Sequence, residues 1–119
     1  MAQIENIAID QGATLRKSFL YTTSLTTLSP VDLTGYSARA QLRKTPSATA
    51  TEVSLTDVAS TDGQVILGGS AGTVTIYIVD AATMRLSGGG VYDVELVSPA
   101  GEVVRLVQGQ YQVSPNITR

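Results

Sequence analysis

Three segments of the chain alternate strictly between apolar and polar residues, which is the period of a β-strand with one face in a core. They are residues 36–43, 73–79 and 92–97. In the second segment Val74, Ile76 and Ile78 share one face, while Thr75 and Tyr77 lie on the other. The alternation predicts three strands, each with one buried side and one side facing water.

Shorter or less regular apolar patterns predict further strands, separated by glycine- and proline-containing turns. These strands are expected at residues 4–10, 15–22, 52–55, 64–67 and 103–113. In the last one we expect a β-bulge at Gly109, because the apolar phase shifts there by one residue. Residues 80–86 instead predict one or two helical turns, with Asp80 as the N-cap and a glycine run after the segment. Short strands at this spacing favour a β-sandwich or barrel over βαβ units.

Composition is typical of one folded domain without the usual catalytic residues. The chain has 119 residues, of which 43% are apolar and only 15% charged, against about 25% charged in globular proteins. It contains no Cys and no His, which excludes disulfides, thiolate and imidazole metal ligands, and a histidine base. We therefore expect a single domain over residues 1–119, no enzyme activity, no catalytic residue, no metal and no cofactor.

The charge pattern argues against nucleic acid and membrane partners. Net charge is −2, and the closest basic pairs, Arg16–Lys17 and Arg43–Lys44, are too small for the basic face that phosphate binding needs. One Phe and no Trp leave few platforms for base stacking. No run approaches the roughly 20 apolar residues that span a bilayer, and the N-terminus lacks the pattern of a signal peptide. We expect a chain made in a cytoplasm-like compartment.

Two loop motifs are candidates for ligand chemistry, and each has a simpler interpretation. The glycine run at 88–90 is followed by a strand instead of a helix and has no suitably spaced Lys, so it indicates a turn and not a phosphate loop. Asp57 and Asp62 share one loop and could form a weak Ca²⁺ site. Two carboxylates without the spacing of a calcium loop fit a solvated loop better.

Asp93 and Glu95 are the one carboxylate pair on a strand face, about 7 Å apart by strand geometry. Such a pair could serve a glycosidase, but a sugar cleft also needs aromatic platforms. A wet outer face, or an ion pair with Arg105 on the neighbouring strand, is the better interpretation. Tyr77 is out of phase with the core, and an exposed tyrosine on a strand is typical of a contact surface.

The N-terminal segment is the main candidate for contact with other subunits. Residues 1–10 form an arm or an edge strand, with Ile4 on one face and Ile7 and Ile9 on the other. A strand that is apolar on both faces is central to a sheet or is covered by something else. We expect a neighbouring subunit to cover part of this segment; the alternative is that it pairs at the edge of its own sandwich. Residues 114–119 form a C-terminal tail.

Motifs in both halves of the chain recur in the same order in one group of proteins. Residues 30–43 combine a Pro-x-Asp-Leu-Thr-Gly entry with a strand that ends in basic residues. Further matching segments are residues 10–14, 62–65, 72–76, 80–86, 90–96, 101–106 and 109–115. In this order the chain resembles small virion proteins of tailed bacteriophages, in particular the N-terminal domain of phage baseplate upper proteins.

The resemblance implies an all-β fold, an Ig-like antiparallel β-sandwich of about seven or eight strands with one short helical crossover. It also implies a non-enzymatic structural component of the virion, assembled in the bacterial host cytoplasm. We expect a tail, baseplate or fibre-attachment adaptor that contacts other virion proteins and is present in multiple symmetric copies or as a homo-oligomer. Alternatives are a capsid decoration (cement) protein and a carbohydrate-binding module for the host surface. A glycosidase using Asp93 and Glu95 comes last.

Overall fold

The computed structural model describes residues 3–22 and 29–117, and strands account for 52% of these described residues. The strands in this part of the chain are β1 (Gln3–Ile4), β2 (Ile7–Asp10), β3 (Leu15–Leu20), β4 (Ser37–Arg43), β5 (Val53–Thr56), β6 (Gly63–Leu67), β7 (Thr73–Ile78), β8 (Gly89–Val97) and β9 (Val103–Ser114). A 3₁₀ turn, η1 (Gly69–Ala71), precedes β7, and one short helix, α1 (Asp80–Met84), follows it.

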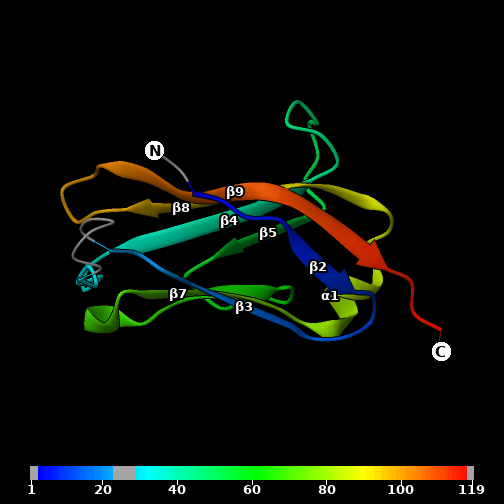
Figure 1. Cartoon of the computed structure of the whole chain (residues 1–119), viewed down its shortest axis with the longest axis horizontal. Helices are drawn as coiled ribbons and strands as arrows, with labels where there is room; N and C mark the ends of the chain where they lie inside the picture. Colours follow the sequence, from blue (N-terminus) through cyan, green and yellow to red (C-terminus); the bar gives the residue numbers. More distant parts are fainter. Residues whose placement is uncertain (1–2, 23–28, 118–119) are drawn as a thin grey trace.

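The strands form two sheets that face each other (Figure 1). The larger sheet has the order β1-β9-β8-β4-β5, with β2 also paired to β9, and the smaller has the order β3-β7-β6. The prediction of a β-sandwich with one short helical crossover is therefore confirmed at this level, because α1 connects β7 in the small sheet to β8 in the large one.

The core lies between the sheets and follows the predicted alternation. Val74, Ile76 and Ile78 of β7 are fully buried, and the inward residues of β4 and β8 are buried as well. Those residues are Ala38, Ala40, Leu42, Tyr92, Val94 and Leu96. Burial of this apolar surface is the main force that holds the sheets together. Leu33, in the segment before β4, also belongs to the core, at 2% exposure.

The N-terminal segment makes the large sheet mixed, so the prediction of a purely antiparallel sandwich is wrong. Both β1 and β2 run parallel to β9. The single predicted strand is divided at Glu5–Asn6, where the Asn6 side chain accepts the hydrogen bond from the Gln110 backbone N–H at 3.0 Å. Opposite this break a Cβ on Gly109 would collide with the Glu5 carbonyl. Gly109 therefore lets the two backbones approach each other.

The β-bulge lies at Leu106 and not at Gly109, where it was predicted. In the pairing of β8 with β9, Val94 faces Val107 but Glu95 faces Arg105, which leaves Leu106 as the extra residue. Leu106 and Val107 are consequently both buried although they are neighbours in sequence. The bulge also keeps Arg105 on the outer face beside Glu95.

The helical crossover forms where predicted but is capped differently. Val79 is the N-cap and provides no side-chain bond, while Asp80 is the first helical residue. The fully buried hydroxyl of Thr83 donates to the Ala13 carbonyl at 2.8 Å and accepts from the Gly12 N–H at 3.1 Å. This hydroxyl therefore connects α1 to the turn between β2 and β3.

The outer edge of β3 carries a charge in a core-phase position. Lys17 alternates with Leu15 and with the buried Phe19, yet its ammonium extends to the Glu5 carboxylate at 2.7 Å. Glu5 lies between β1 and β2, so this ion pair connects the edges of the two sheets. An inward-directed charge on an edge strand discourages pairing with a foreign strand.

Candidate binding surfaces

The three N-terminal isoleucines have different surroundings. Ile9 is fully buried and Ile7 is 7% exposed, both in the core of their own domain, whereas Ile4 is 74% exposed. The segment pairs with β9 of the same chain, which is the alternative considered above. The expectation that a neighbouring subunit covers Ile7 and Ile9 needs correction, since their own core already covers them. Of the three, Ile4 alone offers an open side chain to a partner.

Tyr77 lies on the outer face of the small sheet, as its phase predicts. The Arg16 guanidinium sits over its ring, 4.3 Å from the centroid, which is a cation–π contact. Beside them the hydroxyls of Ser18 and Thr75 are hydrogen-bonded at 2.8 Å. The register places on this face Arg16, Ser18, Leu20, Gln64, Ile66, Thr73, Thr75 and Tyr77. We call this set the small-sheet face; none of these side chains is acidic.

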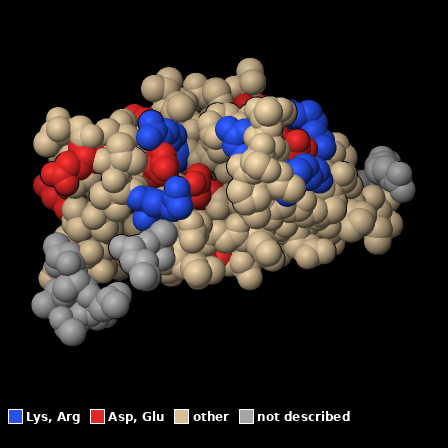
Figure 2. All heavy atoms as spheres, turned by 90° about the horizontal axis from the view of Figure 1, so that it is seen from above, with Lys and Arg blue, Asp and Glu red and all other residues tan. Residues whose placement is uncertain are grey.

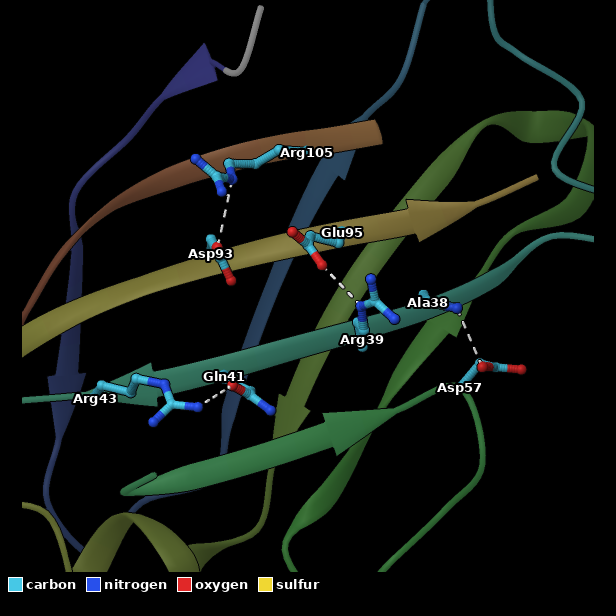
Figure 3. Close-up of polar contacts among 8 residues, drawn as sticks. All are labelled: Ala38, Arg39, Gln41, Arg43, Asp57, Asp93, Glu95 and Arg105. Carbon is cyan, nitrogen blue, oxygen red and sulfur yellow. Dashed lines mark hydrogen bonds and ion pairs between the residues drawn. The ribbon is translucent and has the colours of Figure 1, made fainter. Parts of the chain in front are cut away.

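The outer face of the large sheet is charged, in contrast to the small-sheet face. The Arg39 guanidinium pairs with Glu95 at 2.7 Å, and Arg105 pairs with Asp93 at 3.5 Å (Figure 3). The predicted ion pair of Asp93 with Arg105 is confirmed, and Glu95 is paired with Arg39 on the other neighbouring strand. Figure 2 shows acidic and basic side chains gathered around a hollow on this face.

Asp93 has a raised pKa although a guanidinium is close to it. Burial of the carboxyl is the main cause, and the like charge of Glu95 adds to it. Arg105, Arg43 and Arg39 act in the opposite direction but do not compensate. The protonated form of Asp93 is therefore favoured more than that of an exposed aspartate.

The hollow is a groove of about 470 Å³ across the middle of this face, within the range of small-ligand sites. Its lining comes from β1, β4, β8, β9 and the loop after β4, which rises above the sheet (Figure 1). The lining residues are Ile4, Gln41, Arg43, Pro46, Val91, Tyr92, Asp93, Arg105, Gln108, Gly109 and Gln110. We call it the large-sheet groove.

Two arginine and amide pairs shape the walls of the groove. Arg43 donates from Nη1 to the Ala48 carbonyl at 2.7 Å and from Nη2 to Gln41 Oε1 at 2.8 Å. On the opposite side Arg105 donates to Gln108 Oε1 at 3.1 Å. Sequence patterns did not identify Gln41 or Gln108 as candidates. The available signal was their phase, because each lies on the polar side of its strand, next to Asp93 in the register.

Two core tyrosines differ in how their hydroxyls are satisfied. Tyr92 is 3% exposed and donates to the Glu5 carbonyl. Burial and the charge of Glu5 raise its pKa to about 12. Tyr111 is 2% exposed, and its hydroxyl has no hydrogen-bond partner among the residues that the structure describes. Burial and the charge of Glu52 raise its pKa. A third tyrosine, Tyr36, is partly buried against the core.

The loop motifs have structural partners. Asp57 accepts from the Ala38 N–H at 3.1 Å, and Asp62 pairs with Arg85 at 3.0 Å. Gly88 has a φ of 66° and makes the bend before β8, whereas Gly89 and Gly90 are the first residues of that strand, so the prediction of a turn holds only at Gly88. Within residues 3–22 and 29–117 no three or more acidic side chains gather as a metal ligand set would.

No protein-family model and no curated protein sequence matches this chain. Among the helical residues that the structure describes, no helix is long and apolar enough to cross a membrane.

Proposed function

We propose that this chain is a non-enzymatic structural component of a tailed bacteriophage virion, an adaptor of the tail, baseplate or fibre attachment. The chain is present in multiple symmetric copies and contacts other virion proteins. The resemblance of its ordered motifs to the N-terminal domain of phage baseplate upper proteins is the origin of this proposal. The composition of the small-sheet face is the observation that carries it.

The small-sheet face has the chemistry of a protein contact surface. Interface centres are enriched in tyrosine and arginine and poor in acidic residues, and this face combines Tyr77 with Arg16 and no carboxylate. Leu20 and Ile66 add apolar area at 48% and 37% exposure. The Ser18–Thr75 hydrogen bond satisfies hydroxyls that a partner would otherwise have to desolvate.

We also propose that the fold is Ig-like. In immunoglobulin domains one sheet contains strands B, E and D, and the other contains G, F and C, to which variable domains add C′. Lettered in chain order, β3-β7-β6 corresponds to B-E-D and β9-β8-β4-β5 corresponds to G-F-C-C′. The parallel strands β1 and β2 are additions at the edge beside β9.

Incorporation of variants into particles tests this function. Tyr77→Glu and Ile66→Glu add a charge to the small-sheet face at solvent-accessible positions, so the free chain should keep its melting temperature. We expect both variants to be depleted from purified particles, as measured by quantitative mass spectrometry against the major capsid protein. Ser54→Glu, at an exposed position of β5 in the other sheet, is the control and should be incorporated normally. Normal incorporation of all three variants would contradict the role of this face.

A further inference from the structure

Most of the large-sheet groove lies over three strands, β4, β8 and β9, that are paired on both sides. β4 lies between β5 and β8, β8 between β4 and β9, and β9 between β8 and the N-terminal strands. The backbone groups beneath the groove are therefore used by the sheet ladders. A peptide cannot add to these three strands as a further strand, so recognition over them relies on the lining side chains.

Arg43 gives the groove a fixed positive charge. Both of its recorded hydrogen bonds go to neutral oxygens, those of Ala48 and Gln41. The ion pairs among the described residues engage Lys17, Arg39, Arg85 and Arg105, and not Arg43. A guanidinium held by two neutral acceptors is oriented but not neutralised, and a carboxylate is its natural additional partner.

The groove floor adds groups that suit hydroxyls. Gln41 and Gln108 both line the groove, and each uses the amide oxygen to accept from an arginine, which leaves the amide NH₂ available as a donor. Between them Asp93 uses one carboxylate oxygen toward Arg105, and its other oxygen remains an acceptor. Donors on either side of an acceptor match adjacent hydroxyl groups, since each hydroxyl both donates and accepts.

We propose that the large-sheet groove binds a carboxylate-bearing saccharide, with the carboxylate at Arg43 and the sugar hydroxyls at Gln41, Asp93 and Gln108. A neutral glycan lacks the charge to use Arg43 and would depend on aromatic stacking. The only aromatic residue of the lining, Tyr92, is 3% exposed and cannot serve as a platform.

This inference goes beyond the proposed structural role and is tested on the free chain, so either can fail without the other. The probe is tetragalacturonate, titrated at low salt into the ¹⁵N-labelled chain and followed by amide shifts, including the side-chain amides of Gln41 and Gln108. We expect saturable shifts confined to the groove with Kd of about 1 mM or below. The fully methyl-esterified tetramer should bind at least about tenfold more weakly, because it lacks the carboxylates.

Two variants and a control locate the site. Arg43→Gln should weaken tetragalacturonate binding about tenfold, the scale of one lost charge-assisted hydrogen bond. Gln108 has no role in the core, so Gln108→Ala should fold normally. This variant should weaken tetragalacturonate binding by a smaller factor, which keeps the test informative if Arg43→Gln is poorly folded. Arg16→Gln removes a cation from the small-sheet face and should leave binding unchanged.

Four outcomes would overturn the proposal. They are no shifts at about 10 mM probe, which is about tenfold above the expected Kd; equal binding of the methyl ester; shifts centred on the small-sheet face; and tighter binding of a hexaglutamate peptide than of tetragalacturonate. The last result would assign the groove to an acidic protein segment instead of a sugar.

Discussion

Truncation of Ile9 distinguishes a core strand from a free N-terminal arm. Ile9 is fully buried on β2, while Ile4, five residues earlier in the same segment, is 74% exposed. Ile→Ala in a core costs about 2–5 kcal/mol through lost burial and the cavity left behind. Because β2 is an edge strand that can partly collapse into the space, we expect a loss near the middle of that range, about 3 kcal/mol.

The melting temperature converts this free energy into an observable. With an unfolding entropy of about 2.1 cal/mol/K per residue, a chain of this length loses about 4 °C per kcal/mol. Ile9→Ala should therefore melt about 12 °C below wild type in differential scanning calorimetry. Ile4→Ala removes little buried area and should melt within about 2 °C of wild type. If Ile9→Ala melts as wild type does, the burial of this strand in its own core is wrong, and the arm hypothesis is restored.

Four further changes test other parts of the structure. Tyr92→Phe should destabilise the fold by about 1–2 kcal/mol, because the Glu5 carbonyl loses its hydrogen-bond donor. Tyr111→Phe should be neutral or stabilising, because the Tyr111 hydroxyl has no partner among the described residues. Urea unfolding of the two variants compares these effects. The free energy of unfolding should also fall as pH rises from about 10 to about 12, because in this range the folded chain retains the Tyr92 proton and the unfolded chain loses it. Tyr92→Phe should not show this fall in stability. Asp93→Asn should not lower the melting temperature at pH 7, because the raised pKa of Asp93 means that the folded state disfavours the carboxylate. Any gain in stability of this variant over wild type should disappear as pH falls below the ordinary aspartate pKa. A loss of several degrees at pH 7 would refute this. Lys17→Val should promote self-association in analytical ultracentrifugation, because it removes the charge from the edge of β3; a strictly monomeric variant would contradict that protective role.

The alternating pattern of apolar and polar residues predicts the antiparallel core correctly, because this pattern is a local property of each strand. The buried positions of β4, β7 and β8 follow directly from a period of two. The direction of the N-terminal strand is not local: β2 pairs with residues about a hundred positions later, and its own pattern is the same for parallel and antiparallel neighbours. The mixed sheet therefore could not be predicted from that segment alone.

The bulge was detectable but was assigned to the wrong residue. The phase changes between Leu106 and Val107, two adjacent apolar residues that are both buried, whereas the glycine at 109 serves the close approach of Glu5. This error also obscured the groove. Its central row joins Gln41, Asp93 and Gln108 from three strands, and a one-residue error in the register of β9 moves Gln108 to the opposite face.

Location in a particle is the most direct test of the central claim, that this domain is a structural component of a virion. The measurement is electron microscopy of purified tailed particles whose genome encodes the chain. The particles are labelled with a gold-conjugated antibody against the chain. We predict gold at one fixed position on the tail, baseplate or fibre attachment of most particles. Unlabelled particles, with the chain recovered only in the soluble fraction of the lysate, would contradict the claim.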